Sequence, residues 1–189
     1  MRKLVYYIAV SLDGYIAGPD AEVDFYPTSE DMIDWINARY PETVPGNIRP
    51  LAGLVGQPNR AFDTVLMGRG TYELVLDLPM SPYDHLRQYL VSSTLDVDDP
   101  AVTVIKEDPI GLVRRLKQED SAQDIWLCGG GRLAGALLPE IDELIIKSYP
   151  VIAGTGVPMV SGDFDPTGFT LTDRVFFDNG AQVSWLTRS

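Results

Sequence analysis

Two stretches of the sequence combine glycine, arginine and a following helix pattern in an order suited to holding an anion. They are DIWLCGGGRL at residues 124–133 and DTVLMGRGTYE at residues 63–73. In each stretch an apolar run predicts a strand that ends at glycine and leads into a helix. Glycine lets the backbone approach a ligand closely, and the first free N–H groups of a helix favour negative charge. We therefore expect each turn to hold a phosphate group.

Two such turns side by side could hold the two phosphates of a dinucleotide, with Arg69 and Arg132 facing the anionic groups. Tight turns without a ligand would use the same glycines. A true Rossmann domain is a second alternative, because residues 129–134 fit its G-x-G-x-x-A pattern. That match comes late in the chain, however, and the next strand ends at residues 147–149 without an acid for the ribose.

The composition excludes several classes of function. The 189 residues include 27 acidic and 15 basic side chains, and a net charge of −12 repels nucleic acid and anionic membranes. One cysteine, Cys128, and one histidine, His85, rule out a disulfide framework and a His/Cys zinc cluster. We thus expect no metal, no nucleic acid and no membrane as partners. The apolar run before Asp13 is too short for a signal peptide or a membrane span, which predicts a cytoplasmic protein.

Hydropathy and capping patterns predict strands and helices that alternate along the chain. Strands are predicted at 4–10, 63–67, 87–93, 102–105, from 124, and at 143–149, and helices at 29–40, 71–78, 110–118 and 133–138. The sequence Asp178-Asn179-Gly180 predicts the turn of a hairpin between strands at 170–177 and 181–187. Prolines and glycines predict an irregular insertion at about 41–61.

This alternation predicts a single α/β domain over residues 1–189, since no linker divides the chain. The expected fold is a three-layer sandwich with a mostly parallel mixed sheet and an antiparallel C-terminal hairpin. Residues 11–20 predict a structured loop that could lie across a ligand.

Five stretches, taken together and in order, resemble the dihydrofolate reductase superfamily. They are YIAVSLDGYIA (7–17), MGRGTYE (67–73), VSS (91–93), CGGGRL (128–133) and PVIAGTGVP (150–158). The similarity covers most of the chain and points to the bacterial branch related to the reductase domain of riboflavin-biosynthesis deaminase/reductase proteins. It implies a dihydrofolate reductase-like fold and NADPH as the cofactor. No deaminase half is expected, because the chain lacks the zinc-ligand spacing of that activity.

The same resemblance implies a set of cofactor-binding residues. They are Gly68, Arg69 and Thr71 at the pyrophosphate and 2′-phosphate, Ser92 and Ser93 near the adenosine phosphate, Gly129, Gly130, Gly131, Arg132 and Leu133 along the pyrophosphate, and Ala9, Gly14, Tyr15 and Ile16 around the nicotinamide. Cys128 is expected to line the same site as a small apolar side chain. Tyr15 and Ile16 would help to exclude water.

Three further residues are candidates for handling the substrate. Dihydrofolate reductases carry a substrate-orienting carboxylate on the first helix, where Asp34 is the best candidate. Asp13 is a second catalytic candidate, although an aspartate beside glycine also forms Asx-type turns with its own backbone. Trp35 is a substrate-binding candidate, because its ring could stack on a flat heterocycle, but it could equally belong to the core.

These features predict an NADPH-dependent reductase that transfers a hydride to a pteridine- or pyrimidine-like small molecule. A dihydropterin competes with the ribosylamino-pyrimidine phosphate of riboflavin synthesis, for whose phosphate Arg39, Arg49 and Arg60 are the spare cations. The alternative class is a non-catalytic NADPH-binding sensor or scaffold, in which side chains of residues 41–61 would fill the nicotinamide face.

The C-terminal hairpin also predicts an assembly. An open sheet edge and apolar side chains near the C-terminus must be covered, and the family resemblance suggests a homodimer that buries Val175, Phe176, Phe177 and Trp185. The alternative is that these side chains complete the core of the monomer.

Overall fold

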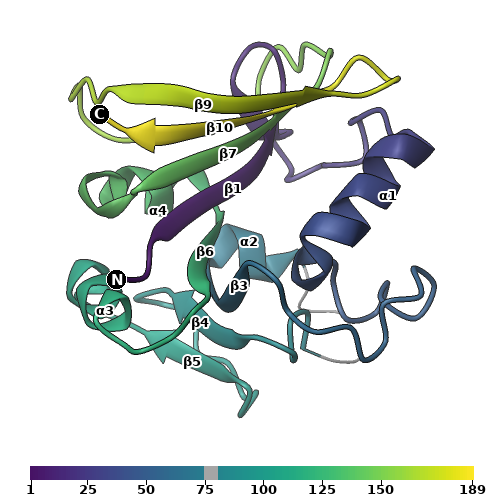
Figure 1. The fold of residues 1–189 in the computed structure, drawn as a ribbon. Coiled ribbons are helices and arrows are strands. Elements are labelled where there is room, and N and C mark those ends of the chain that lie inside the picture. The colour runs from purple at the N-terminus through teal and green to yellow at the C-terminus, as the bar shows by residue number, and fades with distance from the viewer. Residues whose placement is uncertain (75–80) are drawn as a thin grey trace.

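The computed structural model describes residues 1–74 and 81–189, which form an eight-stranded mixed sheet with helices on both faces (Figure 1). The strands of the sheet are β1 (Leu4–Val10), β3 (Phe62–Gly68), β4 (Arg87–Val91), β5 (Val102–Ile105), β6 (Asp124–Gly129), β7 (Glu143–Ser148), β9 (Phe169–Phe176) and β10 (Gln182–Arg188). Their order is β5-β4-β3-β6-β1-β7-β10-β9. Neighbours from β5 to β7 are parallel, whereas β10 is antiparallel to β7 and β9. The predicted parallel sheet with a C-terminal hairpin is confirmed.

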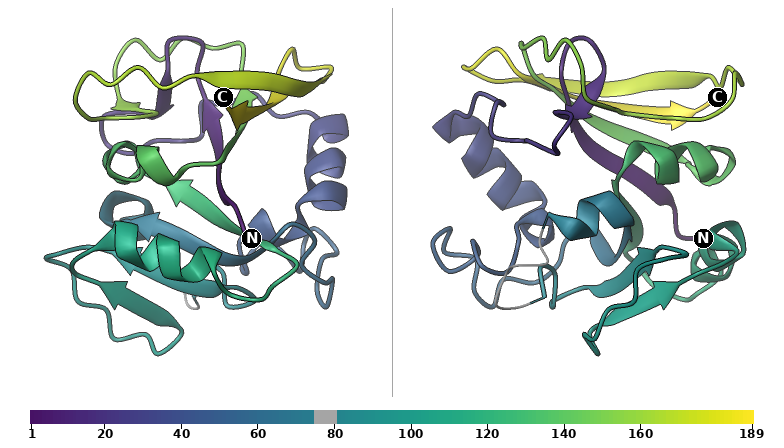
Figure 2. Two further views of the ribbon diagram at one scale, coloured as in Figure 1. Left: turned by 60° about the vertical axis from the view of Figure 1, so that its left-hand side comes forward. Right: turned by 180° about the vertical axis from the view of Figure 1, so that it is seen from behind.

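The helices complete three layers. Helix α1 (Glu30–Arg39) covers one face of the sheet, and α3 (Pro109–Lys117) and α4 (Gly131–Ala136) cover the other (Figure 2). The central strand β1 is buried from both sides, so Tyr6 and Tyr7 enter different cores and are no more than 2% exposed. Short elements fill the connections: α2 (Arg69–Glu73) and the 3₁₀ turns Pro41–Thr43 and Leu138–Glu140. Within the described residues, no helix is long and apolar enough to cross a membrane.

Local signals locate most elements to within two residues. The helix predicted at 29–40 is α1, and α3 begins after Asp108, whose carboxylate accepts a hydrogen bond of 2.9 Å from the Gly111 nitrogen. The helix predicted at 71–78 is seen as α2, and its residues 75–78 lie outside the described part of the chain.

One pairing was not predicted. Strands β2 (Tyr15–Ala17) and β8 (Val157–Pro158) form a separate antiparallel ribbon where the sequence indicated loops. Segments of three and two residues are too short to show the alternation of apolar and polar side chains that identifies a strand.

The stretch 41–61 is irregular, as predicted, but two buried charged side chains hold its backbone. The Glu42 carboxylate is 0% exposed and accepts hydrogen bonds of 2.7–3.1 Å from the backbone N–H groups of residues 60–62. The Arg49 guanidinium donates to the carbonyl groups of Pro41, Leu54 and Gln57. Glu42 and Arg49 thus satisfy backbone groups that lack a partner in a regular element.

The four residues expected at a dimer interface divide between the core and the surface. Phe177 and Trp185 are 9% and 7% exposed, and both pack edge-on against the Trp35 ring at centroid distances of 5.5 and 5.7 Å. Phe176 is 68% exposed on the edge strand β9. The expectation that all four face a partner is therefore wrong for Phe177 and Trp185, because α1 covers them within the monomer.

Candidate functional site

The two glycine turns identified in the sequence meet in the structure. Strands β3 and β6 are parallel neighbours, so their carboxyl ends reach the same edge of the sheet. A Cβ atom on Gly68 would lie 3.3 Å from the Gly130 nitrogen, and one on Gly129 would lie 3.2 Å from the Thr71 hydroxyl. The two turns therefore lie close together: a side chain at Gly68 would crowd the opposite turn, and Gly129 has a φ of +145°, which favours glycine.

The helices that follow the turns are short, at five residues for α2 and six for α4. Their dipoles are correspondingly small, so most of the positive charge for an anion comes from the side chains of Arg69 and Arg132. Both side chains are exposed to solvent. The Arg69 guanidinium lies 2.7 Å from the Glu73 carboxylate and donates to the Thr94 hydroxyl at 3.2 Å.

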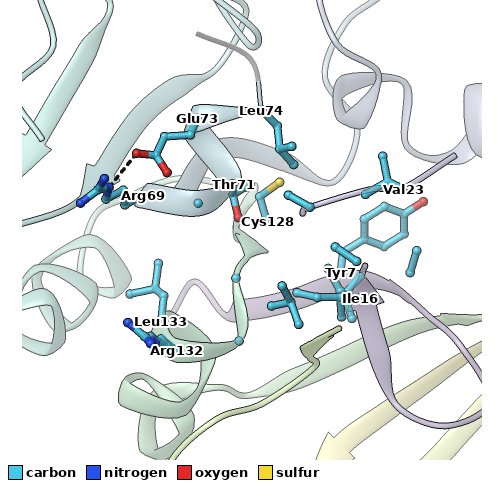
Figure 3. A pocket seen from close by; sticks show the side chains of 18 of the residues that line it. Tyr7, Ile16, Val23, Arg69, Thr71, Glu73, Leu74, Cys128, Arg132 and Leu133 are labelled. Carbon is cyan, nitrogen blue, oxygen red and sulfur yellow. Dashed lines mark hydrogen bonds and ion pairs between the residues drawn. The ribbon is translucent and has the colours of Figure 1, made fainter. Parts of the chain in front are cut away.

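The turns open onto a cavity of about 780 Å³, a volume within the range of small-molecule sites. Figure 3 shows Arg69 and Arg132 on one side of this cavity and Tyr7, Ile16 and Val23 on the other. We call the first side the phosphate end. The second, which we call the aromatic end, is formed by Tyr7, Tyr26, Tyr83 and Trp126.

Most of the residues predicted to bind the cofactor belong to the cavity wall. They are Ala9, Ile16, Arg69, Thr71, Cys128, Gly130, Gly131, Arg132 and Leu133. Gly68 and Gly129 shape the turns behind the wall. Gly14 and Tyr15 lie outside it: the φ of Gly14 is +89°, and its carbonyl oxygen accepts a hydrogen bond from the Met159 nitrogen at 2.9 Å. Gly14 and Tyr15 thus place the ribbon that carries Ile16.

The two predicted serines also lie outside the wall. Ser92 is buried, and its hydroxyl accepts hydrogen bonds from the backbone N–H groups of Thr94 and Leu95 at 3.3 and 3.0 Å. Ser93 is exposed. Ser92 therefore shapes the turn after β4, and this turn presents the Thr94 hydroxyl to Arg69.

The structure does not bring the predicted catalytic carboxylates to the cavity. Asp34 is exposed on α1 and Asp13 is exposed in the loop after β1; neither lines the wall. Trp35 is also outside the wall, where its ring packs against Tyr40 and Trp185 at 5.7 Å in the core. Among the described residues of the wall, Glu73 is the one carboxylate, and it is paired with Arg69 at the phosphate end.

Asp13 instead joins two loops. Its carboxylate accepts hydrogen bonds from the Ser11 hydroxyl at 2.6 Å and from the backbone nitrogens of Ala153 and Gly154 at 3.0 and 2.7 Å. These hydrogen bonds, with that of Ser11 the strongest, lower the pKa of Asp13 to about 2. The loop that carries β2 is thereby tied to the loop that precedes β8.

This geometry predicts a local response to acid. Because the folded pKa is lowered, the Asp13 contact is present above the ordinary carboxyl pKa and is lost as the pH falls through about 2. We expect the amide resonances of Ala153 and Gly154 to shift with that midpoint in an NMR titration, and the Asp13→Asn variant to lose the transition. The exposed Asp34→Asn variant is the control. A wild-type midpoint near that of a free aspartate would contradict the contact.

The aromatic end contains residues that the sequence did not single out. Trp126 lies between Tyr7 and Tyr83, with ring centroids 6.2 and 5.0 Å away. Lys147 of β7 also lines the cavity, and its Nζ atom lies 4.2 Å from the centroid of the Tyr7 ring. The signal that could have identified it is a lysine directly after the apolar run 144–146, because lysine is uncommon among the buried residues of a strand unless it has a partner.

Burial changes the acid–base properties of this end of the cavity. It raises the pKa of the Cys128 thiol to about 12, so Cys128 is a neutral side chain and not a thiolate nucleophile. Burial also lowers the pKa of Lys147 to about 8, which places its titration close to neutrality. Across the described residues, no three His, Cys, Asp or Glu side chains gather to hold a metal ion.

Comparison with known proteins shows the family of the chain. The RibD C-terminal domain family matches residues 2–183. The uncharacterized protein YwjB of Bacillus subtilis is 34% identical over 189 residues, and the match covers 98% of each protein. The chain belongs to the RibD C-terminal domain family.

Solved structures show the same fold as this RibD C-terminal domain. A putative riboflavin biosynthesis protein from Shewanella sp. PV-4 aligns with a TM-score of 0.69 and 23% identity, covering 100% of this chain and 99% of its own. Enterococcus faecalis dihydrofolate reductase, complexed with NADP(H) and RAB-propyl, aligns with a TM-score of 0.65 and 13% identity, covering 99% and 96%. The predicted dihydrofolate reductase-like fold is confirmed. Members of this superfamily use NAD(P)H.

Proposed function

We propose that this RibD C-terminal domain is an NADPH-dependent reductase of a small planar molecule. One observation carries the proposal: a single cavity joins the two glycine turns, with Arg69 and Arg132, to an aromatic end that can hold a flat ring. The residues at the phosphate end fit a dinucleotide, because Gly130 and Gly131 line the cavity without side chains and the Arg69 and Arg132 side chains line it with them.

The chain's own contribution to such a reaction is position and exclusion of water. When bound, the nicotinamide supplies a hydride. Ala9, Ile16 and Val23 line the cavity with apolar surface, which keeps water away from the reacting atoms. The aromatic rings of Tyr7 and Trp126 offer flat faces against which a substrate ring can pack.

The cations expected to hold a substrate phosphate are engaged elsewhere or lie away from the wall. Arg39 lies over the Trp185 ring at 5.4 Å, and Arg49 is buried in hydrogen bonds to the backbone of residues 41–57. Neither they nor Arg60 lines the cavity. This arrangement favours a substrate without a phosphate over the ribosylamino-pyrimidine phosphate of riboflavin synthesis.

The alternative function, a non-catalytic nucleotide sensor, required residues 41–61 to fill the aromatic end. Of that stretch, Thr43 is the one residue in the cavity wall, and the space beside Tyr7 and Lys147 stays open. An open cavity beside the cofactor turns supports an enzyme.

Cofactor binding is the direct test of this proposal. We expect NADPH to quench tryptophan fluorescence in a saturable titration, because Trp126 lines the cavity, and to bind more tightly than NADH because Arg69 and Arg132 favour the additional phosphate. A titration of the Trp126→Phe variant would show whether the signal arises in the cavity. No saturable NADPH binding by calorimetry would reject the proposal.

We also propose a homodimer, now with Phe176 of the edge strand β9 as its most exposed apolar contact. Light scattering tests this, since a mass near the single-chain 20.8 kDa would reject it and Phe176→Asp should dissociate a dimer.

A further inference from the structure

Lys147 differs from the other lysines of the protein in its surroundings. Lys3, Lys106 and Lys117 each lie 2.6–2.9 Å from a carboxylate oxygen, of Glu143, Asp96 and Asp142 respectively. Among the residues that the structure describes, Lys147 has no such partner, and Cys128 is the titratable neighbour that acts on its charge. Lys147 is half-buried, and an ammonium group that is partly shielded from water without a counter-charge is available to a ligand oxygen.

The backbone register points this ammonium group toward the cavity. Lys147 pairs with Ala9 of β1 and with Val183 of β10, so neighbouring strands hold it on both sides. Ala9 is too small to cover it, and Tyr7, one alternation along β1, lies under its Nζ atom. The strand pairing therefore fixes the backbone of Lys147, and the charged end of its side chain faces the cavity.

The Tyr7 ring forms the cavity wall beside it. Tyr7 is 2% exposed, and its hydroxyl is buried next to the Thr43 side chain, so the ring and not the hydroxyl faces Lys147. The other polar groups nearby are already engaged: Trp126 Nε1 donates to the Tyr7 carbonyl at 3.1 Å, and the Tyr26 hydroxyl donates to the Tyr15 carbonyl at 3.0 Å.

Among the described residues that line the aromatic end there is no carboxylate to match the Lys147 ammonium group. The buried carboxylate of Glu42 accepts hydrogen bonds from three backbone N–H groups and lies outside the wall. A dihydropterin presents N–H groups that require a carboxylate, whereas a carbonyl or carboxylate ligand requires donors. The site is thus complementary to an acceptor.

We infer that Lys147 binds the oxygen of a planar conjugated carbonyl compound, such as an enone or a quinone, and gives it the proton that accompanies reduction. The inference rests on the proposed function and names its substrate class. The Tyr7 ring lies under the ammonium group, and the rings of Tyr83 and Trp126 pack against the plane of the substrate.

The reaction balances with a reduced nicotinamide cofactor as the reductant. The terminal carbon of the C=C–C=O system accepts a hydride, and the electron pair of the C=C bond moves to form an enolate. The Lys147 ammonium group gives one proton to the enolate oxygen, which leaves an amine that water reprotonates. The net change is the addition of two hydrogens to the substrate and the two-electron oxidation of the cofactor.

The titratable side chains that surround Lys147 are uncharged near neutral pH. Cys128 of β6 and Tyr149 of β7 have pKa values raised to about 12 by burial, and burial also raises the pKa of Tyr7, Tyr26 and Tyr83. Lys147, with its pKa lowered to about 8, is then the group that changes charge. Binding of an anion is expected to weaken as the pH rises through about 8 in the wild-type protein.

A pair of matched probes tests the inference without turnover. The probes are 2-naphthoate and its neutral counterpart 2-naphthamide, titrated by calorimetry into the full chain with and without NADP⁺. We expect Lys147→Met to weaken naphthoate binding roughly 10-fold or more and to weaken naphthamide binding, in which a neutral carbonyl oxygen accepts from Lys147, by a smaller factor of roughly 2- to 5-fold. Lys147→Gln should behave in the same way, and Lys3→Met, at a paired surface lysine, should change neither. Equal naphthoate affinity in wild type and both Lys147 variants, or no naphthoate binding to wild type at millimolar concentration, overturns the inference.

The outcome is separable from that of the proposed function. NADPH affinity should be unchanged in the Lys147 variants, because Lys147 lies at the aromatic end of the cavity. If wild type fails to bind NADPH but still prefers naphthoate through Lys147, the reductase proposal fails and the anion site stands. With 1,4-naphthoquinone and NADPH, Lys147→Met should lower kcat and abolish its fall above about pH 8; an unchanged kcat and pH profile would reject the proton-donor role.

Discussion

Replacement of Gly130 by valine is expected to weaken NADPH binding severely without unfolding the protein. Gly130 lies in the cavity wall with φ −97° and ψ −170°, an extended conformation that any residue adopts. A Cβ atom there would lie 3.6 Å from the Thr71 hydroxyl, an ordinary contact. The added side chain would therefore project into the cavity, in the space where the backbone must approach a phosphate. We expect the affinity to fall roughly 100-fold or more, as measured by fluorescence titration and calorimetry.

The adjacent glycine is the matched control. A Cβ atom on Gly131 would lie 2.1 Å from the Pro158 carbonyl oxygen, so Gly131→Ala must displace backbone. We expect it to destabilise the fold by about 1–3 kcal/mol, as an overpacked buried site does, and to lower the melting temperature. Wild-type NADPH affinity in Gly130→Val would show that the phosphates bind elsewhere.

Replacement of Glu42 by alanine is expected to cause a large loss of stability. The Glu42 carboxylate is fully buried and accepts hydrogen bonds from three consecutive backbone N–H groups, of residues 60–62. Alanine leaves these donors without an acceptor at the start of β3, and one unsatisfied buried group costs about 1–3 kcal/mol. We expect a total loss of about 3 kcal/mol or more, measured by urea unfolding followed through tryptophan fluorescence.

The Glu42→Gln variant tests the effect of the carboxylate charge while it keeps the shape of the side chain. Glu42→Gln retains one oxygen but places an amide N–H₂ near the Arg60 nitrogen or the N–H groups of Ala61 and Phe62, so we expect a smaller loss. Glu30→Ala, an exposed acid on α1, is the control and should unfold near the wild-type urea concentration. If Glu42→Ala also unfolds there, the backbone of residues 60–62 does not depend on this carboxylate.

The sequence predicts the sheet and the two turns because both rest on local signals. Apolar runs, the Asp108 cap and the Asn179-Gly180 turn each act within a few residues, and each is found where predicted. The phosphate end follows from the same logic, since parallel strands carry their glycine turns to one edge. Glycine spacing therefore identified the two turns that meet at the phosphate end of the cavity.

The aromatic end depends on contacts that the sequence does not show. Lys147 entered the sequence argument merely as a residue that is not an acid, and its surroundings include Tyr7, which is 140 positions earlier in the chain. Asp34 and Trp35 were chosen by their place on a helix, but the rotation of α1 turns Trp35 into the core and Asp34 to the solvent. Helical phase relative to a distant cavity is a tertiary property.

The place of β1 at the centre of the sheet has a consequence for synthesis and folding. Its partners are β6 and β7, so Leu4 pairs with Ile125 and Val5 with Glu143. β1 is therefore synthesised before both of its partners and stays unpaired until residues 124–148 have also been made. Such long-range pairings raise the contact order and slow folding, because loop closure precedes the gain from contact. Among the strands of this sheet, β1 waits longest for its partners, so its apolar run must be shielded from aggregation during synthesis.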